Sequence, residues 1–296
     1  ELNNMSEGSA QGIININILS SIILPVPPLK EQEQIVAFLD DKTAKIDDLL
    51  AKTKKKIELL KEKRTALIYH CVTKGLNPSM EMKDSGVKWI GEIPKDWTTV
   101  KLKYTINPTR KITYGIVQPG VFDSNGRYMI RGQDYSFGWV DESNVFRLSE
   151  KIELPYKRSR IKTNDIVFTI VGAGIGNVGL VPEKYDGSNL TQTTGRLSFN
   201  ENYLSKYIFY ILQSEIKTIQ IGLKQRGSVI PGINLGDLEK FILPVSKNNV
   251  EQTQIVEYLD EQTQKIDTTI EKETQRIGLL KEYRQSLISN VVTGKI

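Results

Sequence analysis

The chain has 296 residues, of which 39% are hydrophobic and 25% charged, and its formal net charge is +5. Its single cysteine, Cys71, excludes an internal disulfide and fits a reducing compartment, and no run approaches the roughly 18 apolar residues that a membrane span needs. The basic balance is compatible with a polyanionic partner, and equally with an ordinary soluble surface that happens to be basic.

The first residues resemble the end of a unit that is complete later in the chain. Residues 13–26 (IININILSSIILPV) are similar to residues 231–245 (PGINLGDLEKFILPV). The chain also begins with Glu1, and no secretory signal precedes this segment. This half copy predicts a fragment or a processed product of a longer chain.

A long segment then occurs twice. Residues 31–73 reappear as residues 251–293, with about half of the positions identical and no gap. Apolar residues recur at alternating spacings of three and four, which predicts two long helices that pack as a coiled coil. A helix of about 44 residues would be on the order of 65 Å long. The apolar heptad positions are Val36, Leu39, Ile46, Leu50, Ile57, Leu60 and Leu67 in the first copy, and Val256, Leu259, Ile266, Ile270, Ile277, Leu280 and Leu287 in the second.

The connection between the two helices favours antiparallel pairing, because the end of the first and the start of the second must both lie near the intervening region. Duplicated halves then imply a pseudo-twofold object. Thr53 and Glu273 are expected near its centre, and Arg64 and Arg284, in matching heptad positions, are expected to be structural. The alternative is that each helix packs on the globular region instead of on the other helix.

The region between the helices is predicted to be α+β. Gly75 and Asn77-Pro78 end the first helix, and a polar connector follows to about residue 88. Residues 202–221 are predicted to form one amphipathic helix, and residues 234–240 a short helix before a final strand. Gly, Asn and Pro turns separate the predicted strands, which are 99–104, 127–131, 165–171, 177–181 and 194–199.

One glycine pattern matches the dinucleotide fingerprint G-x-G-x-x-G at Gly174, Gly176 and Gly179. That fingerprint should open a helix whose N-terminus faces a pyrophosphate. Here a strand-like run leads instead to Pro182. We interpret the segment as a glycine-rich hairpin and predict no nucleotide or S-adenosylmethionine site.

The sequence predicts no catalytic residue. His70 and Cys71 are adjacent on a helix and therefore point in different directions. No Cys/His cluster offers metal ligands. Neither a Walker A run nor the Asn/Asp-Pro-Pro-aromatic motif of an amino-methyltransferase is present. These observations disfavour a stand-alone methyltransferase or nuclease.

Clusters suited to DNA contact lie in the α+β region. Arginine and lysine match guanine, glutamine and asparagine match adenine, and basic side chains also pair with phosphates. An ordinary solvated loop would explain any single cluster. The candidate phosphate contacts are Arg110, Lys111, Lys157, Arg158 and Arg160. The candidate base-reading residues are Arg131, Gln133, Asp134, Tyr135, Gln192, Thr194, Arg196, Lys224, Gln225, Arg226 and Ser228.

The ordered combination of these segments resembles the specificity subunit of a type I restriction-modification system. The resemblance covers essentially the whole chain. Its motifs are SGVKWIGEIPKDWTTVKL (85–102), RYMIRGQDY (127–135), DIVFTIVGAGIGNVGLVPE (165–183), GSVIPGINLGDLEKFILPV (227–245) and EQTQIVEYLD (251–260).

The resemblance implies an α+β target recognition domain on two long antiparallel coiled-coil helices. Residues 1–27 would be the tail of a first recognition domain, 28–75 the central conserved region, 76–246 a complete recognition domain and 247–296 the distal conserved region. Most of the first recognition domain is missing, so the chain would read one half of a bipartite site on double-stranded DNA. It would act as a half-subunit and could pair with a second copy of itself.

The resemblance also implies partners. Methyltransferase (modification) subunits would dock on the chain and recruit restriction (translocase) subunits in the cytoplasm of a bacterium or archaeon. S-adenosylmethionine, ATP and Mg²⁺ would belong to those partners, with no cofactor in this chain. The competing hypothesis is a coiled-coil scaffold whose globular domain binds protein. The dependence of binding on salt concentration distinguishes the two hypotheses, because a DNA-binding protein loses affinity steeply as salt rises.

Overall fold

The computed structural model describes residues 20, 26–136, 138–224 and 232–295. The chain divides into two compact units. We call residues 1–59 with 268–296 the helical unit and residues 60–267 the globular unit. The helices are α2 (Leu29–Lys74), α3 (Glu150–Glu153), α4 (Ser205–Gln213), α5 (Glu215–Lys224), α6 (Leu235–Leu238) and α7 (Asn249–Val292). The strands are β1 (Met82–Asp84), β2 (Glu92–Pro94), β3 (Thr98–Lys101), β4 (Thr113–Tyr114), β5 (Arg127–Ile130), β6 (Arg147–Leu148), β7 (Ile166–Thr169), β8 (Val178–Leu180), β9 (Asn189–Leu190), β10 (Thr194–Leu197) and β11 (Ile242–Val245).

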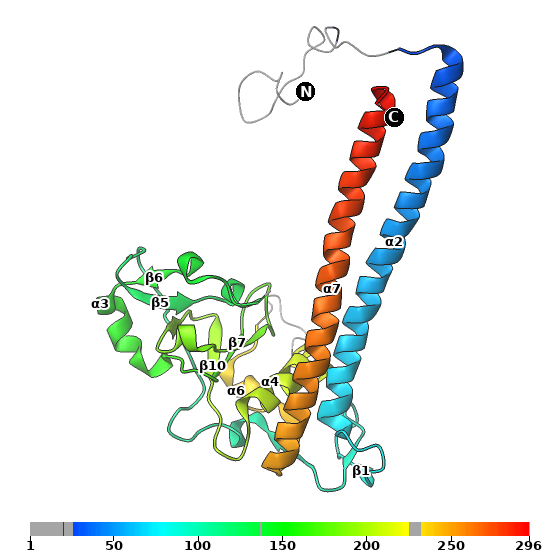
Figure 1. The fold of residues 1–296 in the computed structure, drawn as a ribbon. Coiled ribbons are helices and arrows are strands. Elements are labelled where there is room, and N and C mark those ends of the chain that lie inside the picture. The colour runs from blue at the N-terminus through cyan, green and yellow to red at the C-terminus, as the bar shows by residue number, and fades with distance from the viewer. Residues whose placement is uncertain (1–19, 21–25, 137, 225–231, 296) are drawn as a thin grey trace. The chain divides into compact units, whose positions relative to one another are not determined.

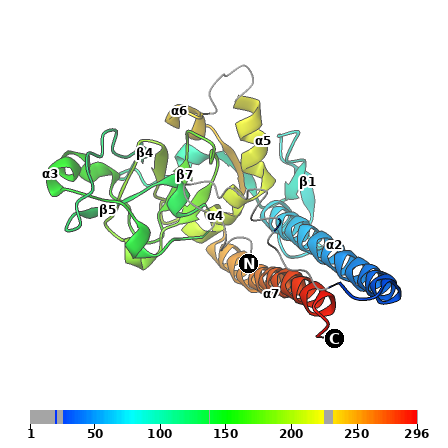
Figure 2. The ribbon, with the colours of Figure 1, turned by 90° about the horizontal axis from the view of Figure 1, so that it is seen from above.

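The long helices α2 and α7 lie side by side and run antiparallel (Figures 1 and 2). In the helical unit, Arg284 Nε lies 2.9 Å from Asp47 Oδ1, and in the globular unit Arg64 Nε lies 2.9 Å from Asp267 Oδ1. Residue numbers therefore rise along one helix as they fall along the other. The two ion pairs join equivalent positions of the repeat, Asp47 with Asp267 and Arg64 with Arg284. The predicted antiparallel pairing is confirmed, and both arginines have the structural role that the heptad pattern indicated.

Several of the predicted heptad positions form the core of the helical unit, whereas Val36 is exposed. Near the middle of the long helices, Thr53 and Glu273 are buried, and Lys56 Nζ donates to Glu273 Oε1 at 2.5 Å. This hydrogen bond lowers the pKa of the Glu273 carboxyl. The apolar core consists of Ile46, Leu287 and Val291, with Ile35, Leu39, Leu50 and Leu280 packed against them.

The ends of the helices follow from local chemistry. Helix α2 stops at Lys74 because Gly75 takes a positive φ of 74°, which glycine adopts without strain. At the start of α7, the Asn248 side chain accepts a hydrogen bond from the backbone amide of Val250 at 2.9 Å. None of the described helices is long and apolar enough to cross a membrane.

The globular unit contains small sheets. Its largest sheet has the order β4-β10-β7-β8, with all neighbours antiparallel. A second has the order β6-β5-β9, in which β5 is antiparallel to β6 and parallel to β9. Two further antiparallel pairs are β11-β3 and β1-β2. The main core lies between α4, the larger sheet and the adjoining ends of α2 and α7, and its largest fully buried side chains include Trp97, Phe168, Tyr207 and Phe241.

The predicted glycine-rich hairpin is confirmed. β7 pairs antiparallel with β8, and the connecting turn places Gly172 and Gly176 at positive φ. Of the three fingerprint glycines, Gly174 and Gly176 lie in this turn and Gly179 lies on β8, so none of them opens a helix.

The predicted helix over 202–221 is wrong in one respect, because it is two helices separated at Ser214. Ser214 has extended backbone, with ψ at 176°. Its hydroxyl donates to the carbonyl oxygen of Ile211 at 2.7 Å and accepts from the amide of Ile216 at 3.3 Å. A serine that bonds the backbone on both sides competes with the helical hydrogen-bond ladder and ends α4.

Candidate nucleic-acid interface

A basic hollow of about 640 Å³ opens on the globular unit. One wall is a loop that leads into β4, another is the turn after α3, and β10 supplies the floor. Among the described residues, no carboxylate lines it. We call this site the basic hollow. Its lining residues are Pro108, Thr109, Arg110, Lys111, Ile112, Thr113, Tyr114, Lys157, Arg158, Arg196 and Leu235.

Arg196 connects the two walls of the basic hollow through hydrogen bonds to their backbones. Its side chain is only 3% exposed. The guanidinium donates to the carbonyl oxygens of Lys111 at 2.9 Å and Arg160 at 3.1 Å, and also to that of Arg158. One planar fork therefore fixes two segments that are far apart in the sequence. Burial, and then the nearby positive charge of Arg110, lowers the pKa of Arg196 to about 10.

Arg196 was predicted to read bases, whereas two of the predicted phosphate contacts are ion-paired within the unit. Arg110 pairs with Asp165, whose second oxygen accepts from the hydroxyl of Ser198 at 2.6 Å. Arg160 makes a bidentate pair with the fully buried carboxylate of Glu153, at 2.6 and 2.5 Å. This hydrogen bonding lowers the pKa of Glu153 and raises that of Arg160. These pairs hold the walls of the basic hollow in place.

The other three predicted phosphate contacts are open to solvent. Lys111, Lys157 and Arg158 are exposed and line the basic hollow. In the part of the chain that the structure describes, no carboxylate pairs with any of them. The structure thus brings together two segments that the sequence left separate, with their free cations on one surface.

Most predicted base-reading residues that the structure describes have internal roles. Asp134 is buried and accepts from both the amide and the guanidinium of Arg131. The Tyr135 hydroxyl shares a hydrogen bond of 2.7 Å with the Thr169 hydroxyl, and burial raises its pKa to about 12. Thr194 is fully buried. These side chains shape the domain, because burial leaves them little exposed polar surface for a base edge.

The remaining predicted base-reading residues differ in accessibility. Gln133 and Gln192 are exposed, and both stay candidates for base contact. Lys224 Nζ lies 3.5 Å from Asp237 Oδ1. Three further candidates lie outside the described residues, namely Gln225, Arg226 and Ser228.

Lys217 gives a pH-dependent prediction. Its Nζ donates to the carbonyl oxygen of Gly176 in the hairpin at 2.7 Å, and burial lowers its pKa to about 8 from an ordinary value of 10.5. Between these two pH values the unfolded chain binds more protons at this site than the folded chain does, so folding stability rises with pH. We expect Lys217→Met to remove this rise, measured by urea unfolding across that range. Lys162→Met, at an exposed lysine of the same unit, should leave it unchanged.

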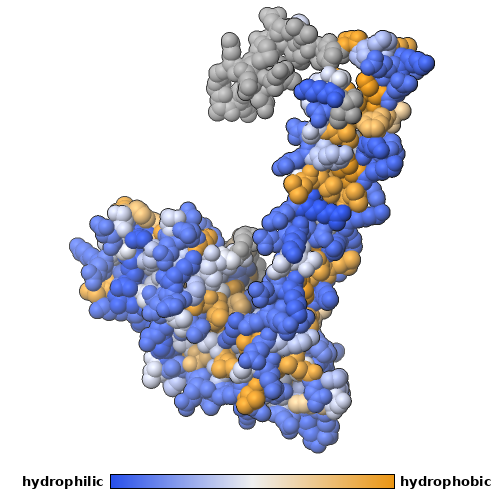
Figure 3. All heavy atoms as spheres, in the orientation of Figure 1, coloured by the Kyte–Doolittle hydropathy of each residue, from blue (hydrophilic) through white to orange (hydrophobic). Residues whose placement is uncertain are grey.

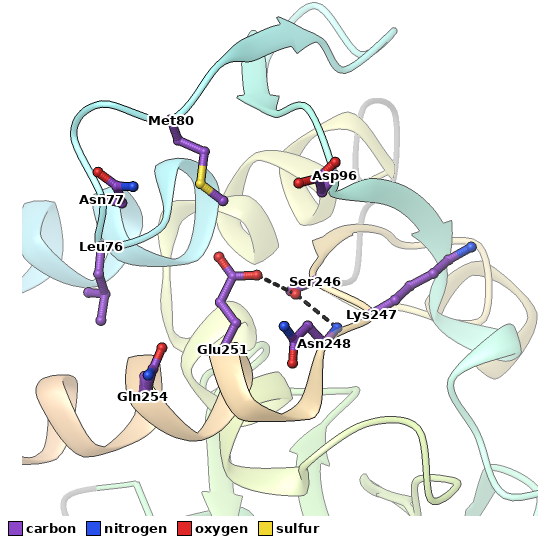
Figure 4. Close-up of a pocket in the computed structure, with 9 residues that line it drawn as sticks. All are labelled: Leu76, Asn77, Met80, Asp96, Ser246, Lys247, Asn248, Glu251 and Gln254. Atoms are coloured by element: carbon purple, nitrogen blue, oxygen red, sulfur yellow. Dashed lines mark hydrogen bonds between the residues drawn. The ribbon is translucent and has the colours of Figure 1, made fainter.

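A second hollow, of about 570 Å³, lies at the start of α7 (Figure 4). Its central carboxylate, Glu251, accepts from the indole of Trp97 at 2.9 Å and from the hydroxyl of Ser246 at 2.5 Å. Glu251 therefore anchors the beginning of the helix to the globular unit. Among the described residues, no group of three or more His, Cys, Asp or Glu side chains is placed to hold a metal ion.

Comparisons with known proteins agree with this architecture. The chain is 30% identical over 285 residues to the EcoBI type I restriction enzyme specificity subunit of Escherichia coli, and 26% identical over 299 residues to the MjaVIII specificity subunit of Methanocaldococcus jannaschii. These alignments cover 94% and 100% of this chain. The chain spans 59% of the length of the first relative and 67% of the second.

Two solved structures share the fold. One, from work on complex assembly and conformational transition of the type I R-M system, matches 96% of this chain and 65% of that chain with a TM-score of 0.73 and 16% identity. The other, the crystal structure of the HsdS subunit from Thermoanaerobacter tengcongensis, matches 100% of this chain and 68% of that chain with a TM-score of 0.54 and 17% identity.

The family described as "Type I restriction modification DNA specificity domain" matches two stretches of the chain, residues 1–59 and 90–278. These two stretches include most of both long helices and most of the globular unit. The chain belongs to the family of type I restriction-modification DNA specificity domains.

Proposed function

We propose that this chain is the DNA-recognition subunit of a type I restriction-modification assembly and reads one half of a bipartite site. The family match over both helices and the globular unit carries this proposal. The basic hollow supports it, because it offers exposed cations on the domain that would meet DNA. The chain itself would perform no catalysis.

The domain plan of this proposal assigns residues 28–75 to the central conserved region, 76–246 to the recognition domain and 247–296 to the distal conserved region. Residues 1–27 would be the tail of another recognition domain. One support is that equivalent glutamines near the start of both helices donate to a backbone carbonyl oxygen of the preceding segment. Gln252 donates to the carbonyl oxygen of Ser246 at 2.9 Å, and its equivalent, Gln32, donates to that of Pro27 at 2.7 Å.

Helix α7 contacts α4 of the globular unit through residues that belong to the repeat. Asp260 accepts from Lys206 Nζ at 2.7 Å and from the Tyr210 hydroxyl at 2.6 Å, both on α4. Val256, one turn earlier, is 9% exposed in the same core.

The equivalent residues of α2 are Asp40 and Val36, and Val36 is 57% exposed. Hydrophobic side chains are visible among polar ones along the helical unit (Figure 3). We infer that this part of α2 suits another recognition domain, supplied by a longer chain or by a second copy acting as a half-subunit.

The partners in this proposal supply the chemistry. Modification subunits would dock on the chain and bring S-adenosylmethionine, and restriction subunits would bring ATP and Mg²⁺. The complex would work in the cytoplasm of a bacterium or archaeon. The relatives named above, from one bacterium and one archaeon, are consistent with either host.

Methylome sequencing tests the proposal directly. The chain would be expressed in a methylation-free host with its cognate modification subunit, and we expect one new methylated sequence motif. The modification subunit expressed alone is the control and should give none. A symmetric motif would indicate self-pairing of half-subunits. If the motif were identical with and without the chain, the chain would not be the recognition subunit.

A further inference from the structure

The basic hollow carries more positive charge than the protein neutralises. Of its five lining cations, only Arg110 has a carboxylate partner within the described residues. Lys111, Lys157 and Arg158 are exposed. Arg196 lies beneath them, and its guanidinium donates to backbone carbonyl oxygens, while the Asp165 carboxylate attracts it without a direct hydrogen bond.

Arg196 is unusual for a buried arginine. Only 3% of its surface is exposed, and its buried Nε has no hydrogen-bond partner in the described part of the chain. A buried charge without a direct ion-pair partner costs free energy. An anion in the space above would lower that cost, because Coulomb attraction strengthens where water is excluded.

The chemistry of the lining selects a phosphate over a base edge. Lysines offer point charges on flexible stems, which suit phosphate oxygens. The hydroxyl of Tyr114 adds a donor of the kind that contacts DNA backbones, whereas those of Thr109 and Thr113 donate to Asn107 Oδ1 and to the Tyr114 carbonyl oxygen. No asparagine or glutamine is among the lining residues, so the amide pair that reads adenine is absent from this set.

We propose that the basic hollow is an oxyanion seat, formed by Lys111, Lys157 and Arg158, that takes a backbone phosphate of the bound DNA. This assignment rests on the proposed function. Arg196 acts as a positioning residue, because its guanidinium holds the carbonyl oxygens of Lys111 and Arg158, two of the residues whose side chains meet the phosphate.

Inorganic phosphate is the first probe. At constant ionic strength, replacing chloride by phosphate should raise the melting temperature of the wild-type chain. The triple variant Lys111→Gln, Lys157→Gln, Arg158→Gln should lose this increase. The matched control is Lys83→Gln, Lys88→Gln, Lys101→Gln, which removes the same charge from exposed residues of the same unit and should keep it.

A short random-sequence duplex is the second probe. Each lost phosphate contact lowers the slope of log affinity against log salt by about 1, so the triple variant should lose about 2–3. The control triple should lose less than about 1. Arg196→Lys keeps the charge without the planar fork, and we expect a smaller loss of slope than in the triple variant.

The outcomes separate the two proposals. If the triple variant and the control respond alike to both probes, the oxyanion seat is overturned while DNA recognition stands. If phosphate stabilises through these residues but the DNA slope is unchanged, the seat takes a free anion, and its assignment to DNA is overturned. If neither the wild-type chain nor any variant binds DNA, the proposed function fails. If phosphate then still stabilises the wild-type chain and the control but not the triple variant, the three residues bind an oxyanion that is not DNA.

Discussion

Replacing Glu153 by alanine is expected to lower the free energy of unfolding of the globular unit by about 3–5 kcal/mol. The carboxylate is fully buried and accepts from Arg160 twice and from the Asn189 amide at 3.0 Å. Arg127 adds a longer contact at 3.5 Å. Removing the carboxylate leaves a guanidinium and an amide without their partner. Guanidinium unfolding followed by tryptophan fluorescence measures this, because Trp89, Trp97 and Trp139 all lie in this unit.

Glu150→Ala is the matched control, since Glu150 is exposed on the same short helix. It should change stability by less than about 0.5 kcal/mol. The pKa of Glu153 is lowered from 4.5, so its contribution is complete above pH 4.5 and is lost as the pH falls through the depressed folded value. The difference in the free energy of unfolding between wild type and Glu153→Gln should therefore become smaller in acid. A gap that stays constant with pH would show that the charge does not matter.

Replacing Leu259 by alanine is expected to cost about 2–5 kcal/mol, because its side chain is fully buried in the main core and the structure relaxes only partly around the cavity. The repeat provides an internal control. Leu39 occupies the equivalent position on α2, where it is only partly buried. Leu39→Ala should therefore cost clearly less in the isolated chain.

The same unfolding measurement, read by circular dichroism for the helices and by fluorescence for the globular unit, compares the two variants. Equal costs would contradict the view that only the second copy is covered by a recognition domain. A larger cost at Leu39, seen only when a second recognition domain is supplied, would identify the part of α2 that this domain covers.

The helices were predictable from sequence because the same heptad pattern occurs twice without proline. The strands at 127–131, 165–171, 177–181 and 194–199 were also found, since Gly, Asn and Pro turns separate them. The pairing of β1, in the predicted polar connector, with β2, just after it, was missed, because strands of three residues are too short for a period of two to show. The break at Ser214 was missed because a hydrophobic pattern does not reveal which way a serine hydroxyl bonds.

The candidate site was predicted only in part, for a different reason. Sequence shows where arginines lie but not which carboxylate meets them, and the partners of Arg110 and Arg160 had no sequence signal. Arg196 looked like a base reader because it follows polar residues. It lies on β10, whose four residues are all buried between neighbouring strands and helices, so its guanidinium turns to carbonyl oxygens instead of to DNA.

The two ion pairs between α2 and α7 are sensitive to a change in the length of either helix. Asp47 meets Arg284 and Arg64 meets Asp267, so each helix supplies one acid and one base. A residue inserted between Asp47 and Arg64 on α2 would lengthen that stretch by about 1.5 Å and rotate one contact away from its partner. Only an equal insertion between Arg284 and Asp267 would restore both. A change in the length of one helix between these pairs therefore separates one pair unless the other helix changes by the same length.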